Sequence, residues 1–211
     1  MTLRDTLSAL ENLNKANWSE NASSNKDAWI DGFWANYDTQ RKNKEVEYIS
    51  PWTAFISGLS SKEQMSDEQA MKMFSKAFNR AKDSSFVDPK GNSLKASEWT
   101  DASKNTLLII MLQHGRNNIA ERLIQLYSNV RHSNENGLTP LHAAAATGSI
   151  EMCEQLISRG ADPLAKIKDT GDYPYQIAEI HGHKKVSEYL LREAKAKHFF
   201  QVARQAGSVN R

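Results

Sequence analysis

Apolar residues along this chain recur at spacings of three and four positions, which is the period of an α-helix. The first hundred residues contain four such stretches, which we expect to begin near Leu3, near Trp29, at Ser50-Pro51 and at Ser66. Ser50-Pro51 has the form of a helix start and Ser66–Gln69 that of a capping box. The polar stretches 19–28 and 38–47 are expected to be loops, and residues 88–92 a turn. Because no stretch alternates as a strand does, the pattern predicts an all-α protein.

The predicted helix near Trp29 has a broad aromatic face, with Trp29, Phe33 and Tyr37 at helical spacing. All five Trp and five of the seven Phe precede residue 100. These rings either fill the core of a small helical domain, which we favour, or leave part of the stripe exposed as an interface. We therefore assign residues 1–100 to a helical, aromatic-rich N-terminal domain.

The pattern of residues 137–148 returns further along the chain. The segment reads Gly-Leu-Thr-Pro-Leu-His-Ala-Ala-Ala-Ala-Thr-Gly, and Gly171, Tyr173-Pro174, Ala178 and Gly182 later occupy the same frame. A weaker copy precedes the segment, and in it Thr106 matches Thr139. The second interval is longer than the first by a single residue, which is expected within residues 166–170. Periods in the low thirties are typical of stacked helical repeats, since one unit cannot bury its apolar stripe alone.

Thr-Pro-Leu-His at 139–142, the small Ala144 and Ala145, and Gly160-Ala161-Asp162 at the end of the unit resemble the ankyrin repeat family. The resemblance implies three helix-turn-helix repeats, at about 103–133, 134–166 and 167–192. The expected fold is thus an ankyrin-type stack over 101–192, flanked by the α-helical N-terminal domain or cap and by a C-terminal capping helix. In this frame Thr139 caps a helix that Pro140 begins, and His142 bonds within the scaffold.

In proteins that resemble this one, partners lie along the concave face, against hairpin tips and first-helix positions that the fold leaves free. The resemblance therefore implies a surface for another protein made of Asn105, Gln113, His114, Glu135, Asn136, Leu138, Ala146, Thr147, Asp169, Thr170, Asp172, Ile180 and His181. The layout is also similar to that of bacterial ankyrin proteins, including effectors delivered into host cells and inhibitor or immunity-type proteins.

The tail, residues 193–211 with Arg192 before it, is basic, although the whole chain has a net charge of only +2. Phe199, Phe200 and Val202 predict a helix there. It either caps the last repeat with its aromatic residues, which we favour, or contacts a membrane surface or nucleic acid.

Three features bear on the compartment. The chain shows no membrane-spanning apolar run and no N-terminal signal, and its one cysteine, Cys153, falls at an expected core position. These features indicate a reducing cytoplasm, and delivery into a host cell without a signal sequence would leave the same pattern.

The chain lacks the common motifs of catalysis, phosphate binding and metal ligation, so we expect no cofactor and no metal ion. His181 and His183 are two positions apart and would diverge on a helix. The carboxylates Asp27, Asp31 and Asp38 cluster near the aromatic helix. Asp27 and Asp31, four residues apart, could do acid–base work, although Asp27 is more simply a partner of the helix N-terminus and Asp31 a residue of the polar face. We expect a binding protein rather than an enzyme. The alternative is an enzyme with a catalytic N-terminal domain and repeats that recruit substrate.

Overall fold

The computed structural model describes residues 11, 27–43, 49–61, 65–81, 95–96, 99–126 and 128–208, with side chains up to residue 205. The chain divides into two compact units, residues 1–99 and 100–211. The described parts contain helices and no strand beyond an isolated bridge between Thr100 and Thr106, which confirms the all-α class. No described helix is long and apolar enough to cross a membrane. The helix predicted near Leu3, most of the 19–28 loop and the 88–92 turn lie outside the described residues.

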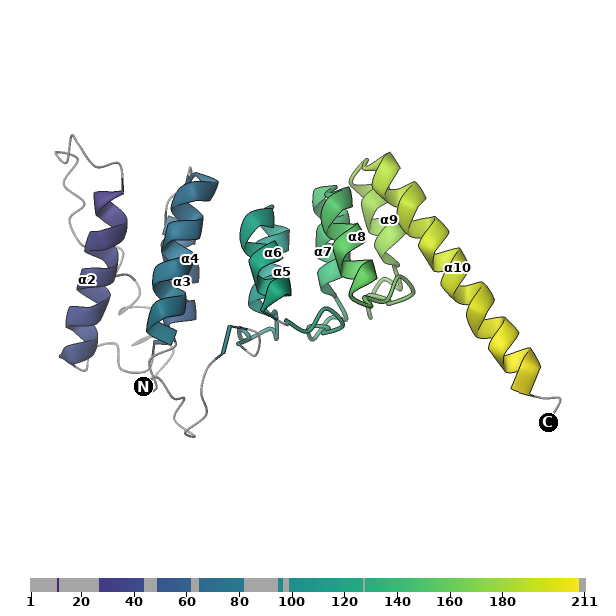
Figure 1. The fold of residues 1–211 in the computed structure, drawn as a ribbon, viewed down its shortest axis with the longest axis horizontal. Helices are drawn as coiled ribbons and strands as arrows, with labels where there is room; N and C mark the ends of the chain where they lie inside the picture. Colours follow the sequence, from purple (N-terminus) through teal and green to yellow (C-terminus); the bar gives the residue numbers. More distant parts are fainter. Residues whose placement is uncertain are drawn as a thin grey trace. The chain divides into compact units, whose positions relative to one another are not determined.

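The described part of the first unit consists mainly of three helices, α2 (Ala28–Lys42), α3 (Pro51–Ser61) and α4 (Asp67–Ala81), shown in Figure 1. Both predicted helix starts are confirmed. The Ser50 hydroxyl accepts a hydrogen bond from the Thr53 amide at 3.0 Å. At Ser66 the capping box is closed in both directions with Gln69, at 3.2 Å each way. The loop predicted for 38–47 is wrong over its first residues, because α2 continues to Lys42 and Arg80 of α4 binds Asp38.

The aromatic residues of these helices form a core, as favoured from the sequence. Phe33, Trp34, Tyr37, Trp52 and Phe55 are all at most 1 % exposed. Phe33 and Trp34 meet edge to face with ring centroids 5.2 Å apart, which is a favourable aromatic geometry. The buried Tyr37 hydroxyl donates to the Ile49 carbonyl at 2.8 Å, so its one polar group is satisfied.

The described part of the second unit is a stack of three helix pairs, shown in Figure 1. The pairs are α5 (Leu107–Gln113) with α6 (Asn117–Gln125), α7 (Pro140–Thr147) with α8 (Ile150–Ser158), and α9 (Pro174–Ile180) with α10 (Lys184–Ser208). First helices pack on first helices and second helices on second helices. The first helices begin at Leu107, Pro140 and Pro174, which confirms the predicted register, including that of the weak first repeat.

A hairpin precedes each first helix, and its backbone hydrogen bonds locate the extra residue. In the first two hairpins the Asp101 and Asn134 amides donate to carbonyls four residues ahead, whereas the Ile167 amide donates five residues ahead, to Asp172. The additional residue therefore lies inside the third hairpin, as predicted. Gly137 brings two hairpins into contact, because a Cβ atom there would lie 2.8 Å from the Lys166 carbonyl oxygen.

The last repeat carries polar residues where the middle repeat has apolar ones. Glu179 and Ser187 stand in the register of Ala145 and Cys153, both of which are fully buried, and Glu179 is exposed. A polar outer face of this kind is what a terminal repeat needs.

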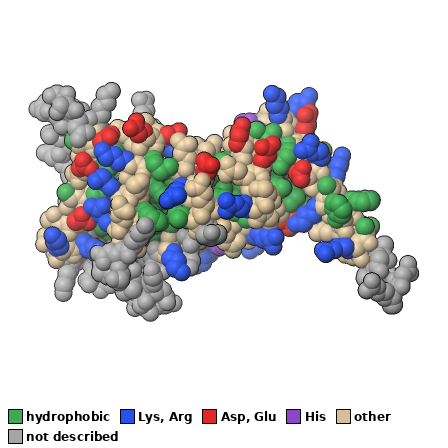
Figure 2. All heavy atoms as spheres, in the orientation of Figure 1, with side chains coloured by type: hydrophobic (Ala, Val, Ile, Leu, Met, Phe, Trp, Pro, Cys, Tyr) green, Lys and Arg blue, Asp and Glu red, His purple; other side chains and the backbone are tan. Residues whose placement is uncertain are grey.

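The expectation that the tail caps this repeat with its aromatic residues is wrong. α10 is one continuous helix of 25 residues, so the tail prolongs the second helix of the last repeat. Val186, Leu190 and Ala194 on one side of α10 are buried, whereas Phe199 and Phe200 are 69 % and 67 % exposed. At about 100° per residue Phe199 lies opposite the packed side and Phe200 about 80° from it, and both rings remain largely exposed. Figure 2 shows hydrophobic side chains near the free end of this helix.

Candidate functional site

The predicted surface begins with hairpins whose backbones are tied to one another. The Glu135 amide donates to the Ser103 carbonyl at 3.2 Å, and the Lys168 amide donates to the Asn136 carbonyl at 2.8 Å. These two bonds join the three hairpins into one ribbon. The side chains of Glu135, Asn136, Asp169 and Thr170 are exposed on it.

Asn134 holds the middle hairpin in shape. Its side-chain oxygen accepts from the amides of Asn136 and Leu138 at 3.0 and 2.9 Å. Its amide nitrogen donates to the Asn105 side chain at 2.8 Å. Asn105 donates in turn to Asp101 at 2.9 Å, so both ends of the Asn105 amide are already bonded within the scaffold. Asn105 is therefore part of the scaffold, and its side chain has little hydrogen-bonding capacity left for a partner.

His142 connects the hairpins to the first helices. The Thr139 amide donates to its Nδ1 at 3.2 Å, which leaves Nε2 to donate to the Asp172 carbonyl at 3.2 Å. Burial lowers the pKa of His142, because the charged imidazolium would lose its hydration. The neutral ring therefore acts as a scaffold group, as the family resemblance implied.

The remaining predicted residues lie at the far ends of the first helices. Gln113, His114, Ile180 and His181 are exposed there, and Ala146 and Thr147 are partly exposed. The Thr147 hydroxyl donates to carbonyls one turn back, at 3.2 and 3.4 Å. With helices of seven or eight residues, this row lies about 12 Å from the hairpin row. The structure thus gathers the predicted surface into two rows at the two ends of the first helices.

Two other histidines have scaffold bonds. His132 bonds through Nε2 to the Lys104 carbonyl at 2.7 Å. His183 bonds through Nε2 to the Ala146 carbonyl at 3.1 Å, and its ring stacks against that of His181. Within the described ranges, no group of three His, Cys, Asp or Glu side chains is placed to hold a metal ion.

The candidate acid–base carboxylates form ion pairs between α2 and α4. Asp27 pairs with Lys72 at 3.1 Å, Asp31 with Lys76 at 2.9 Å and Asp38 with Arg80 at 2.6 Å. The hydrogen bond from Lys76 is the main cause that lowers the pKa of Asp31. The Asp31 carboxylate is thus held in its ionised form, and the three ion pairs have the geometry of a structural ladder between α2 and α4.

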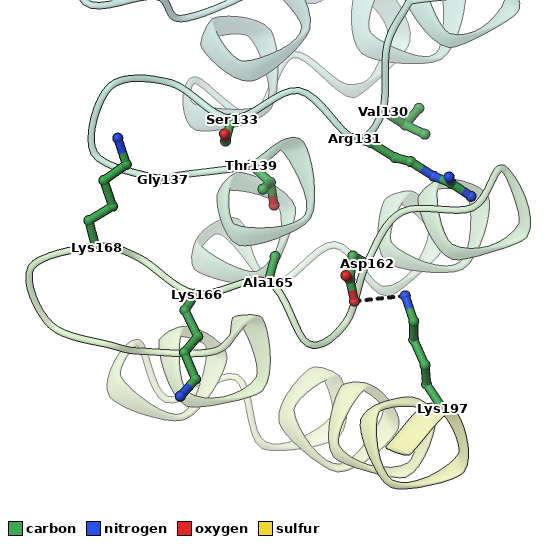
Figure 3. Close-up of a pocket in the computed structure, with 10 residues that line it drawn as sticks. All are labelled: Val130, Arg131, Ser133, Gly137, Thr139, Asp162, Ala165, Lys166, Lys168 and Lys197. Carbon is green, nitrogen blue, oxygen red and sulfur yellow. Dashed lines mark ion pairs between the residues drawn. The ribbon is translucent and has the colours of Figure 1, made fainter. Parts of the chain in front are cut away.

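Sequence reasoning missed one cluster of side chains, on the underside of the hairpins. Arg131, Lys166, Lys168 and Lys197 line a pocket there (Figure 3). Lys166 and Lys168 on either side of Ile167 are the one sequence signal for it, and within a hairpin that signal is weak.

Comparison with known proteins agrees with this architecture. The family described as "Ankyrin repeats (3 copies)" matches residues 90–167 and 108–202, which together span more than half of the chain. The ankyrin repeat and KH domain-containing protein mask of Drosophila melanogaster is 36 % identical over 92 residues, covering 43 % of this chain and 2 % of the relative. The human ankyrin repeat and KH domain-containing protein 1 is 34 % identical over 92 residues, 43 % of this chain and 4 % of the relative. Human espin-like protein is 35 % identical over 77 residues, 36 % of this chain and 8 % of the relative.

The chain thus spans a small part of the length of these relatives. Three helix pairs in a regular register, hairpins tied by backbone bonds and the family match over the same residues agree with one another. This chain is a member of the ankyrin repeat family, whose repeats form a protein-interaction module.

Proposed function

We propose that this protein binds a segment of a partner protein along the concave face of its repeats, between the hairpin row and the first-helix row. The observation that supports this is the ribbon of hairpins tied by backbone bonds, with the side chains of Glu135, Asn136, Asp169 and Thr170 exposed on it. Because these bonds already fix the backbone of the hairpins, partner binding orders little additional backbone, and less of the contact energy is spent on ordering.

The residues of the two rows indicate the chemistry of the partner. Glu135, Asp169 and Asp172 make the hairpin row acidic, and Leu138 and the 69 % exposed Ile180 add apolar contacts. A partner segment with basic and apolar side chains complements this surface. A specific interface needs about 800 Å² on each side, which three repeats can supply.

The test is an affinity capture of partners from lysate, quantified by mass spectrometry. The variant Glu135→Ala/Leu138→Ala/Asp172→Ala removes one apolar and two acidic side chains from the hairpin row and keeps the Asp172 carbonyl that His142 binds. The matched control is Glu121→Ala/Glu154→Ala/Glu188→Ala, with one exposed residue on each second helix. Circular dichroism establishes that both variants are folded.

We expect the capture to identify partner proteins that bind the wild type and the control variant but not the hairpin variant. Retention of every partner by the hairpin variant would remove the concave face as the binding surface. If both variants lost the same partners to the same extent, the loss would be a general effect of charge and would also contradict the proposal.

A further inference from the structure

The hairpins have a second surface of opposite charge. A cavity of about 380 Å³ lies on their underside, between the base of the hairpins, the loop after α8 and the side of α10. None of its lining residues belongs to the predicted concave face. Along the middle hairpin, Ser133, Gly137 and Thr139 line the cavity, whereas Glu135, Asn136 and Leu138 of the concave face do not.

Basic side chains surround this cavity. Figure 3 shows Arg131 and Lys197 on one side and Lys166 and Lys168 on the other. The one acidic lining residue, Asp162, is already paired with Lys197 at 2.9 Å. The lining has four cations and one anion, a surplus of three positive charges. Residues 100–211 as a whole contain 14 Lys and Arg against 11 Asp and Glu, so the surplus around the cavity equals that of the entire unit.

The cations are positioned by contacts that leave their charge available. The Arg131 Nε donates to the Gly160 carbonyl at 2.6 Å, which directs the guanidinium without neutralising it. The Lys166 ammonium lies 4.9 Å from the centre of the Tyr173 ring, a cation–π contact. No carboxylate of the described residues pairs with Arg131, Lys166 or Lys168. A local surplus that the protein does not balance attracts an anionic ligand.

The lining also has apolar and hydrogen-bonding groups. Val130 and Ala165 contribute apolar surface, and the exposed Ser133 hydroxyl bonds to none of the described residues. The volume is at the small end of the range for ligand pockets, with room for a few side chains of an extended segment. A nucleic acid strand instead needs a groove of cations that follows its backbone and aromatic platforms for its bases. Here the cations surround one bounded cavity and the lining holds no aromatic residue.

We propose that this cavity is a second interaction site, which binds an extended segment of a partner protein rich in Asp and Glu. Carboxylates of the segment would pair with Arg131 on one side and with Lys166 and Lys168 on the other. The cavity would then bind acidic segments of a partner, and the concave face would bind basic segments.

The experiment measures the fluorescence anisotropy of a short labelled peptide of alternating Glu and Ser on titration with the full chain. The test variant is Lys166→Glu/Lys168→Glu. The matched control is Lys184→Glu/Lys185→Glu, which reverses two exposed lysines at the start of α10, outside the cavity. Acidic residues there suit the positive end of the helix, so the control remains folded. A Gln-Ser peptide and a labelled oligothymidylate are titrated in parallel.

We expect the acidic peptide to bind, and its affinity should decrease as the salt concentration is raised. The test variant should bind it on the order of tenfold more weakly than the wild type, and the control should bind it as the wild type does. Amide resonances of Ser133, Ala165 and Lys166 should shift on binding in a nuclear magnetic resonance titration. The concave-face variant Glu135→Ala/Leu138→Ala/Asp172→Ala should bind the acidic peptide as the wild type does, which separates this proposal from the proposed function.

Three results would overturn it: no binding of the acidic peptide, equal losses in the test and control variants, or tighter binding of oligothymidylate than of the peptide. The last would make the cavity part of a nucleic-acid surface.

Discussion

At the scale of single residues, the three repeats solve the same turn with different side chains. Each hairpin needs one left-handed residue, which is Gly137 with φ 82° in the second hairpin and Gly171 with φ 75° in the third. In the first hairpin Lys104 adopts φ 63°, and it is the one non-glycine among the described residues with positive φ. A Cβ atom disfavours this conformation by roughly 1 kcal/mol.

Exchanging these residues should therefore change stability in opposite directions. Lys104→Gly is expected to raise the free energy of unfolding by about 0.5 kcal/mol, since relief of strain exceeds the added freedom of the unfolded chain. Gly171→Lys should lower it by about 1 kcal/mol, because only the backbone conformation is unfavourable where no atom lies within 4 Å of the new Cβ. Urea denaturation measures both variants. A loss of stability in Lys104→Gly would contradict the argument.

His142 makes stability depend on pH. Its folded-state pKa lies below the ordinary 6.5 because it is buried, so the unfolded chain binds the proton more readily. We expect the free energy of unfolding to be highest above pH 6.5 and to decrease as the pH falls through and below that value. In His142→Gln the decrease should be smaller, because the variant lacks the titrating imidazole. Gln is a suitable replacement, since Gln176 in the third repeat accepts a hydrogen bond from the backbone amide of its own N-cap residue. Urea titrations at several pH values compare the two, and identical pH profiles would refute this role.

At the scale of elements, each second helix packs one apolar stripe between neighbours. Leu156 of α8 is fully buried, and Cys153 beside it is a free thiol whose pKa burial raises to about 12. Such a thiol is unreactive at neutral pH and acts as a small apolar side chain.

Leu156→Ala should reduce the free energy of unfolding by roughly 2–5 kcal/mol, the usual cost of removing a buried leucine side chain. Chemical denaturation followed by circular dichroism gives the value. A cost below about 1 kcal/mol would mean that α8 is not packed in the register described here.

Substitutions near the C-terminal end of α10, at Phe199 and Phe200, should affect stability less than a substitution at Leu190. Phe199→Ala/Phe200→Ala is expected to leave stability within about 0.5 kcal/mol of the wild type, because both rings are largely exposed. Leu190→Ala on the packed side of the same helix should cost roughly 2–5 kcal/mol. The same denaturation assay measures both variants. A large loss of stability in Phe199→Ala/Phe200→Ala would show that the rings are buried.

At the scale of the whole molecule, the chain is two compact units with different sources of stability. The first unit has an aromatic core and a ladder of ion pairs between α2 and α4. The second is a linear stack in which each repeat packs on the next, and its last repeat has a polar outer face.

We therefore expect residues 100–211, expressed alone, to fold. The fragment should be helical by circular dichroism and should melt in one cooperative transition. A fragment without cooperative melting would show that the stack needs the first unit as a cap on its other end.

The sequence by itself determined the class, the register and much of the local structure. Helical spacing of apolar residues, the starts at Ser50 and Ser66, and the signature at 139–142 depend on neighbours within a few residues, so they are readable along the chain. A fixed period in the low thirties then implies which helices stack. The extra residue of the third hairpin followed from the same comparison.

Only the tertiary structure decided which side chains share a surface. Lys197 of α10 and Arg131 come to the same cavity as Lys166 although they are far apart in the sequence, and no local pattern encodes that distance. The two sides of α10 were likewise decided by the stack, which covers Leu190 and ends before Phe199. Both outcomes depend on where the chain folds back on itself, whereas propensity and periodicity act only between near neighbours.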